Sequence, residues 1–170
     1  MPIVQLPILN ASINGALTNG AYQNPYSIYA TNDVWNGLVW VFPDNGNRTG
    51  LTGRFRVPIG YVDSANFIVE WTSTAIVGDT FWDIDYRVVT GLTDTTSMDQ
   101  TGETQAVALG ATAAPTTAHN RMLNDIDVLD TNFSAQATIE WSLFRNDVEV
   151  GDDMAAAGLL LDLFFEYSDE

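Results

Sequence analysis

The chain contains no cysteine, no lysine and a single histidine, His119. Without cysteine there is no disulfide framework, no thiolate metal site and no cysteine nucleophile. One histidine is too few for a histidine-based metal centre. A Ser-His-Asp triad would need His119, but the sequence has no G-x-S-x-G elbow to supply the serine. We therefore expect His119 to be an ordinary loop residue.

Positive charge is scarce as well. The sequence has 22 acidic residues against 6 basic ones, all arginine, and a formal net charge of -16 at pH 7. Such a surface repels phosphate, so we expect no binding to nucleic acid or to anionic membranes. No apolar run is long enough to span a bilayer, and the sequence opens without the basic and apolar regions of a secretory signal.

Hydrophobic residues make up 46% of the 170 residues, which is enough for one domain with a substantial core. The first 33 residues differ from the rest, because they are rich in Asn, Gly and Tyr and interrupted by proline. We expect residues 1–33 to form an extended arm that packs either on a partner or on its own domain. Residues 34–170 are expected to form the domain itself.

The clearest strand pattern lies between Phe67 and Val89, where apolar and polar side chains alternate in two segments. A period of two is typical of a half-buried β-strand. The pair Gly78-Asp79 separates the two segments and is a turn signal. The sequence therefore predicts a hairpin here, with its two strands at the centre of the core.

Similar patterns predict further strands at residues 34–42, 51–57, 105–109, 121–129, 137–145 and 159–167. Asn45-Gly46 predicts a hairpin turn, and Gly37 is a candidate bulge. The segment 154–158, MAAAG, predicts one helical turn. The last strand is strongly apolar and expected to be central, with one face formed by Leu159, Leu161, Leu163, Phe165 and Tyr167.

About eight strands with almost no helix indicate an all-β fold, a two-sheet antiparallel β-sandwich. A jelly roll is the expected topology. An immunoglobulin-like sandwich is the alternative.

Carboxylates are the abundant reactive groups. Asp83 and Asp85 share one face of a predicted strand, and Glu70 is expected across the hairpin from them. Two acids at that spacing can hydrolyse a glycoside or hold Ca²⁺. We favour a simpler interpretation, a solvated strand face on which Arg87 neutralises the acids.

The polar loop 90–104 offers further calcium ligands in Asp94, Asp99 and Glu103, but it lacks the spacing of an EF-hand, and a solvated loop is favoured. We thus assign no catalytic, cofactor-binding or metal-binding residue and expect no cofactor. Three tryptophans, Trp71, Trp82 and Trp141, fall on apolar strand faces and are expected in the core. Trp35 and Trp40 are candidates for a ligand platform or an interface anchor.

Three segments, VEWTSTAIVGDTFWDIDYRVV, TIEWSLFRND and LLLDLFFEY, resemble the small jelly-roll structural proteins of tailed-phage virions. The resemblance covers residues 54–168. It implies a capsid decoration (cement) or head-fibre protein without catalytic activity, a homotrimer docked on the major capsid protein at the virion surface. Such proteins stabilise a shell by burying surface across its junctions.

Three hypotheses for the function follow. The first is a non-enzymatic virion structural protein that decorates and stabilises a capsid. The alternative is a carbohydrate-binding β-sandwich module, which predicts exposed tryptophans over a shallow groove. The third is a glycosidase that uses a pair of acids among Glu70, Asp83 and Asp85.

Overall fold

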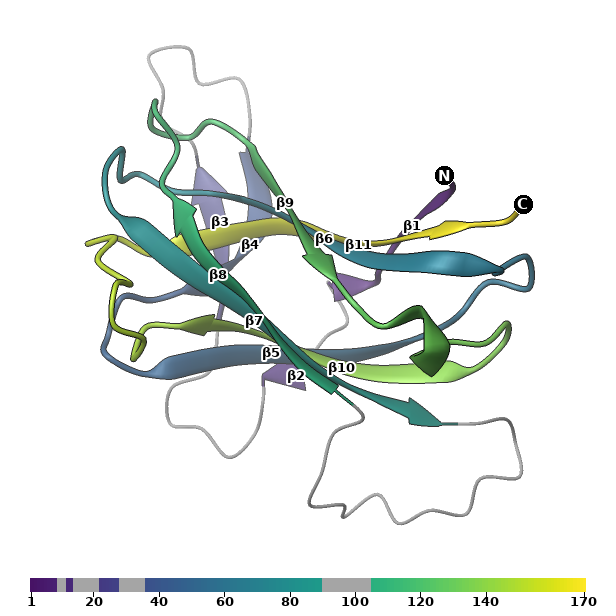
Figure 1. Cartoon of the computed structure of the whole chain (residues 1–170). Coiled ribbons are helices and arrows are strands. Elements are labelled where there is room, and N and C mark those ends of the chain that lie inside the picture. The colour runs from purple at the N-terminus through teal and green to yellow at the C-terminus, as the bar shows by residue number, and fades with distance from the viewer. Residues whose placement is uncertain (9–11, 14–21, 28–35, 90–104) are drawn as a thin grey trace.

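The computed structural model describes residues 1–8, 12–13, 22–27, 36–89 and 105–170 (Figure 1). These residues are almost entirely β-structure, with a 3-10 helix, η2, at Asp130–Asn132. None of their helices is long and apolar enough to cross a membrane. The strands are β1 (Ile3–Gln5), β2 (Ser12–Ile13), β3 (Tyr22–Ser27), β4 (Asn36–Phe42), β5 (Arg48–Arg56), β6 (Asp63–Thr72), β7 (Asp79–Val89), β8 (Gln105–Ala113), β9 (Met122–Asp127), β10 (Thr138–Asn146) and β11 (Gly158–Ser168).

Two antiparallel sheets pack face to face. In the described part of the chain, the six-stranded sheet has the order β3-β4-β11-β6-β9, with β1 also paired to β11, and the five-stranded sheet has the order β2-β5-β10-β7-β8. Strands β4 to β11 form a jelly roll, so the predicted fold is confirmed. Each of the eight predicted strands is present, although β8 continues past its expected end at Leu109 to Ala113.

Both predicted hairpins are wrong. β6 and β7 lie in opposite sheets, and so do β4 and β5. The turn signals are nevertheless real, because Gly78 has φ +91° and Gly46 has φ +69°, a conformation that glycine adopts at little cost. At each turn the chain crosses to the other sheet instead of pairing with itself. Alternation of apolar residues reports the buried face of a strand and says nothing about its neighbour.

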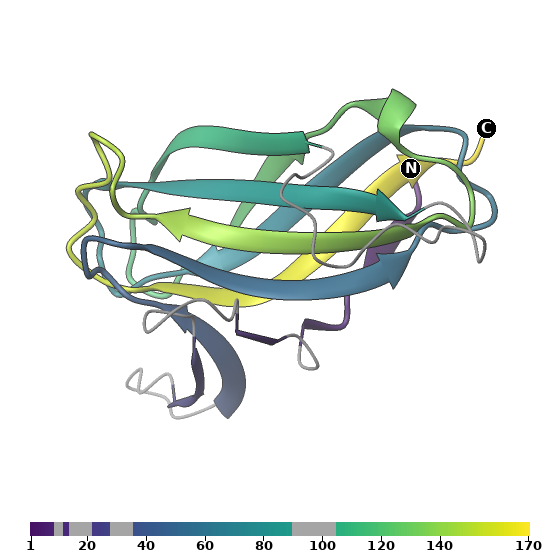
Figure 2. The ribbon, with the colours of Figure 1, turned by 90° about the horizontal axis from the view of Figure 1, so that it is seen from below.

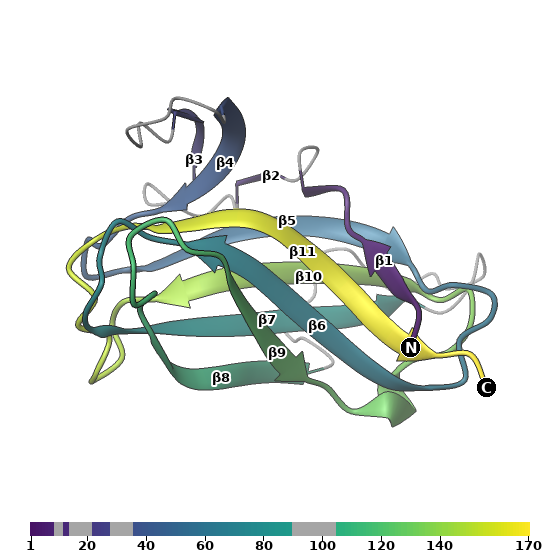
Figure 3. The same cartoon turned by 90° about the horizontal axis from the view of Figure 1, so that it is seen from above.

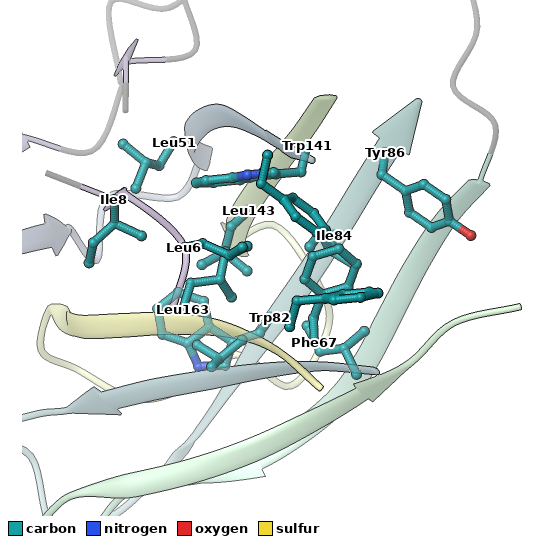
Figure 4. Close-up of a cluster of buried hydrophobic side chains, with 14 of the residues drawn as sticks. Leu6, Ile8, Leu51, Phe67, Trp82, Ile84, Tyr86, Trp141, Leu143 and Leu163 are labelled. Carbon is teal, nitrogen blue, oxygen red and sulfur yellow. The ribbon is translucent and has the colours of Figure 1, made fainter. Parts of the chain in front are cut away.

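The core between the sheets is rich in aromatic rings (Figure 4). Trp71, Trp82 and Trp141 are buried in it, as predicted. The ring centroids of Trp71 and Trp82 lie 5.7 Å apart, and those of Phe67 and Phe165 lie 5.5 Å apart. Aromatic pairs at these distances each contribute about 0.5–1.5 kcal/mol beyond the burial of their area.

The first residues of the chain pack on this core. Leu6 and Ile8 are buried within it (Figure 4). The Leu6 N–H donates to the carbonyl oxygen of Leu163 at 2.8 Å, and Trp40 Nε1 donates to the carbonyl oxygen of Ile8 at 2.9 Å. Farther along, β2 pairs with β5 and β3 pairs with β4. The described portions of residues 1–27 therefore extend the two sheets.

Strand β11 is central in its sheet, as predicted, but its alternation is interrupted. The register against β6 shifts between Leu160 and Asp162. Leu160 therefore enters the main core, whereas Leu159 and Leu161 pack in a small separate cluster with residues of β4. The prediction that Leu159 and Leu161 share the core face is wrong, because the extra residue of a bulge reverses the alternation.

The bulge predicted at Gly37 is not found. Strand β3 pairs with β4 from Tyr22–Val41 to Ser27–Asn36 without a shift of register.

Candidate functional site

A group of charged and aromatic side chains lies on the outer face of the five-stranded sheet. It consists of Arg48 on β5, Phe144 and Asn146 on β10, and Asp83 and Asp85 on β7, and we call it the Arg48 cluster. β10 runs between β5 and β7 (Figure 2). The register places Arg48 opposite Asn146, and Phe144 opposite Asp83. Directly opposed residues point to the same face, so the sheet itself assembles the cluster.

Arg48 reaches across the middle strand. Its two terminal nitrogens each donate to one carboxylate oxygen of Asp85 at 3.0 Å, and its Nε donates to Asp83 Oδ2 at 3.3 Å. Its Cζ lies 3.7 Å from the centroid of the Phe144 ring. Bidentate pairing and stacking are what the planar guanidinium provides and an ammonium does not. Arg48 thereby covers the ring and links two acids.

Two acceptors in the cluster lack a donor. Asn146 Nδ2 donates to Asp83 Oδ2 at 2.8 Å and to Glu149 Oε1 at 3.3 Å. The other oxygens, Oδ1 of Asp83 and Oδ1 of Asn146, are buried without a hydrogen-bond partner. A buried acceptor without a donor costs about 1–3 kcal/mol. A donor that enters from outside would recover this free energy.

The electrostatic balance of the cluster is negative. Burial raises the pKa of Asp83, while the charge of Arg48 and the hydrogen bond from Asn146 lower it, and the charge of Asp85 raises it further. One guanidinium thus faces two carboxylates, with Glu149 as a third close by. An anionic ligand is disfavoured here, whereas a neutral ligand with hydroxyl groups is not.

Glu70 does not join these acids. It lies on β6, on the outer face of the other sheet, where its Oε1 is 2.5 Å from Nε of Arg121. The core separates it from Asp83 and Asp85, so its predicted position across a hairpin is wrong. Glu70 therefore cannot form a glycosidase pair with Asp83 or Asp85.

The predicted neutralising cation is also wrong. Arg87 forms an ion pair with Glu140, while Arg48 is the partner of Asp83 and Asp85. Asp83 is moreover buried and not solvated. Sequence reasoning missed Arg48 and Asn146 as site residues, since both lie at strand ends beside turns. The signal that could have pointed to Arg48 is an arginine at the start of a strand in a chain with so few cations.

The remaining candidates do not assemble a site. His119 lies in the turn between β8 and β9 with φ +68°, and its N–H donates to the carbonyl oxygen of Ser73 at 2.9 Å. Asp94, Asp99 and Glu103 lie outside the described residues. Across the described ranges, no three histidine or acidic side chains converge on a possible metal position.

The tryptophans do not form a binding platform in the described part of the chain. Trp40, one of the two candidates, is buried in the core. Trp35 lies outside the described residues. The exposed-tryptophan groove expected of a carbohydrate module is therefore not found there, and Phe144 is the aromatic ring of the Arg48 cluster.

A buried arginine fixes the loops at one end of the sandwich. Arg145 is fully buried, and its guanidinium donates to Asp152 Oδ1 at 2.6 Å and to the carbonyl oxygens of Met154 at 2.8 Å and Ala156 at 2.6 Å. The predicted helical turn at residues 154–158 is wrong: Ala156 lies in a bend, its N–H donates to the carbonyl oxygen of Met154 at 2.8 Å, and β11 begins at Gly158.

These loops expose aliphatic side chains. Ile76 and Val77 lie in the β6–β7 loop, and Val148 and Val150 lie in the β10–β11 loop; we call the four residues the end patch. Their exposed fractions run from 54% for Ile76 to 98% for Val150. The two loops are joined where Asp79 N–H donates to Asp153 Oδ1 at 2.7 Å.

Comparisons with known proteins agree with this architecture. No protein-family model and no curated protein matches the sequence. Among solved structures, the chain is similar to a family 35 carbohydrate binding module from Clostridium thermocellum, with a TM-score of 0.53 and 9% identity over 99% of this chain and 100% of that chain.

Two further likenesses are weaker. The C-terminal CBM6 of LamC, a marine laminarinase from Zobellia galactanivorans, has a TM-score of 0.48 and 12% identity over 96% of this chain and 98% of that chain. A chain in the structure of infectious bursal disease virus Gx strain has a TM-score of 0.36 and 8% identity over 85% of this chain and 36% of that chain. Of these three, only the first exceeds a TM-score of 0.5, and it shows a shared fold alone. Membership of a tailed-phage virion stays a prediction.

Proposed function

We propose that this chain is a non-catalytic module that binds neutral carbohydrate, with the Arg48 cluster as its site. One observation carries the proposal: Asp83 Oδ1 and Asn146 Oδ1 are buried acceptors without donors beside an arginine that is partly exposed. The likeness to a carbohydrate binding module over the whole length of both chains supports it.

The chemistry of a sugar fits this arrangement. A hydroxyl group both donates and accepts, so it can donate to an unpaired carboxylate or amide oxygen and accept from a guanidinium N–H. The side chain of Arg48 is 35% exposed and that of Asp83 is 7% exposed, so a ligand meets Arg48 first. Movement of Arg48 uncovers the Phe144 ring, on which the apolar face of a sugar can stack.

The charge selects among sugars. The cluster is net negative, and the whole chain carries a formal charge of -16. Uronic acids and sulfated sugars are repelled by such a surface. We therefore expect neutral oligosaccharides to bind in preference to anionic ones.

Isothermal titration calorimetry of the full chain with neutral gluco- and galacto-oligosaccharides, and with polygalacturonate as the anionic comparison, tests the proposal. We expect at least one neutral ligand to bind and Arg48→Gln to weaken that binding by tenfold or more. Arg54→Gln is the matched control, because Arg54 lies on the same strand and outer face but outside the cluster.

The Arg54→Gln control should bind the same sugar with a Kd within twofold of that of the unmodified chain. If no neutral sugar binds at millimolar concentration, or if both substitutions weaken binding equally, the Arg48 cluster is not a carbohydrate site. Thermal unfolding of each variant shows whether a loss of binding is a loss of fold.

A second candidate function is capsid decoration, and the end patch favours it. We propose that, in this case, the four aliphatic residues Ile76, Val77, Val148 and Val150 dock on the major capsid protein, with the chain as a homotrimer on the virion surface. Exposed aliphatic side chains gathered at one end of a domain are suited to an interface, because their burial is favourable.

The native mass of the purified chain, measured by light scattering, tests the trimer. Decoration predicts the mass of three chains, and Val150→Asp should leave that mass unchanged while it weakens binding to isolated phage capsids. Val62→Asp, at an exposed valine of the β5–β6 turn, is the control and should change neither the mass nor the binding. A monomer that also fails to bind isolated phage capsids contradicts decoration.

A further inference from the structure

A polar cavity of about 300 Å³ lies on the six-stranded sheet, which is the sheet opposite the Arg48 cluster. The start of β6, the end of β9 and the end of β11 lie side by side there (Figure 3). Asp130 of η2 completes the wall on one side. The volume is at the lower end of the range for small-molecule sites.

Three side chains of the cavity are aligned across three strands. Asn66 on β6 lies directly opposite Glu166 on β11 and Asp127 on β9, so all three point to the same face. Asn66 is only 8% exposed, and its Oδ1 is buried without a hydrogen-bond partner. The cavity therefore holds a buried acceptor with a carboxylate on each side.

The wall carries more carboxylates than cations. Asp130 adds a third carboxylate, whose Oδ1 already accepts the Ala65 N–H at 2.5 Å. Among the residues that line the cavity, the only cation is the terminal ammonium of Met1, and no side chain is basic. Three carboxylates against one ammonium leave a negative potential that attracts further cations, and the unpaired Asn66 oxygen needs a donor.

We propose that this cavity binds an organic cation that carries ammonium groups. β6 separates β9 from β11, so the backbones at Asp127 and Glu166 lie about 10 Å apart, two strand spacings. A calcium ion needs oxygen ligands at about 2.3–2.6 Å, and no three acidic side chains of the described residues converge in that way. Ammonium groups on a short alkyl chain can instead donate to both carboxylates and to Asn66.

The ammonium can come from a free diamine or polyamine, or from a lysine side chain of a partner protein. A second copy of this chain cannot supply a lysine, because the sequence contains none. The shared chemistry is the donor-rich cation, and the experiment separates its two sources.

The test is an NMR titration of the ¹⁵N-labelled full chain with butane-1,4-diamine at neutral pH and low salt. We expect saturable shifts of the amide signals of residues 64–66 and 127–130. Butane-1,4-diol, which has the same length without charge, should produce none. Shifts that do not saturate, or that spread over the acidic surface, overturn the proposal.

Two substitutions separate the cavity from the general negative charge. Asp127→Asn should weaken diamine binding at least fivefold. Asp125→Asn removes the same charge from the same exposed face of β9, outside the cavity, and should change binding less than twofold. Equal weakening by both substitutions overturns the proposal. The proposal is also overturned if calcium chloride shifts the same amide signals with a lower Kd than the diamine.

Nα-acetyl-lysine methylamide is the probe for a protein side chain. If it binds as tightly as the diamine, a partner's lysine is the ligand; if it binds more than tenfold more weakly, a free diamine or polyamine is. Both results support an ammonium site. Equal binding of the Nε-acetylated form, which has no ammonium, contradicts it.

Discussion

A β-carbon added at Gly53 on β5 would lie 2.5 Å from Cζ2 of Trp141 on β10, a separation that real side chains do not tolerate. The two residues are directly opposed in the sheet, and the indole occupies the space that a side chain at Gly53 would need. Trp141 is fully buried and has little room to move.

Gly53→Ala is therefore expected to destabilise the fold by about 1–3 kcal/mol, the usual cost of overpacking a core. Urea denaturation monitored by tryptophan fluorescence measures it. Gly60→Ala is the control, because the β-carbon added there would lie 3.6 Å from its nearest neighbour, an ordinary contact. An equal free energy of unfolding for the two variants would contradict this, because it would show that the Trp141 ring can move to relieve the contact.

Arg145→Met is expected to cost about 3–5 kcal/mol, because it leaves Asp152 as a buried carboxylate without its cation. The Asp152 side chain is completely buried, and it also accepts from Thr80 Oγ1 at 3.1 Å. The double variant Arg145→Met with Asp152→Asn should recover part of the loss, since a neutral amide oxygen still accepts from Thr80. Chemical denaturation of the unmodified chain and the two variants provides the comparison, and a double variant no more stable than Arg145→Met would contradict the assignment.

The contribution of Glu70 and Asp162 to the stability of the fold should rise when the pH falls below neutrality. Glu70 and Asp162 lie directly opposite each other, and burial raises the pKa of both, with the charge of Asp162 raising that of Glu70 further. A carboxyl group with a raised pKa binds a proton more tightly in the folded state. Its contribution to stability is therefore present in acid and is lost as the pH rises through the folded pKa.

Asp162→Asn, which stays uncharged, should thus have a higher Tm than the unmodified chain at pH 7, with the difference vanishing below about pH 4, near the unfolded pKa. Melting curves between pH 4 and 8 measure it. Asp125→Asn, on an exposed face of β9, reports how much any single charge matters. An Asp162→Asn difference that is the same at every pH would refute the role given to ionisation.

The bulge in β11 predicts opposite tolerances at two adjacent leucines. Leu160 is fully buried in the main core, while Leu161 is partly exposed and packs on the small cluster beside β4. Leu160→Ala should cost about 2–5 kcal/mol, and Leu161→Ala should cost less than half as much. The free energies of unfolding in guanidinium decide between this register and simple alternation, which places Leu161 in the core.

The sequence was sufficient for the jelly roll because every strand from β4 to β11 carries its own alternation. Which strand pairs with which was harder to predict. The apolar faces of β6 and β7 are equally consistent with a hairpin and with two strands that face each other across the core, and only contacts distant in sequence decide. In the same way, alternation cannot locate a bulge, so Leu159 and Leu161 were assigned to the wrong face.

The candidate site was harder to predict from the sequence than the strand pairing. Asp83 and Asp85 were identifiable as a pair of acids on one face, but their cation comes from a strand two places away in the sheet. Arg48 reaches them over Phe144, and its residue number gives no hint of that contact. The cavity at Asn66 is built from three strands whose register is a property of the whole sheet.

The pairing of β1 with β11 gives the molecule nearly the connectivity of a ring. Ile3 lies opposite Glu166, so the two ends of the chain emerge next to each other (Figure 3). A short linker between them would close the ring at little entropic cost. New ends could then be opened in an exposed turn such as the one around Gly46, with every strand pair retained. The order in which the strands are synthesised is thus separable from the architecture they form.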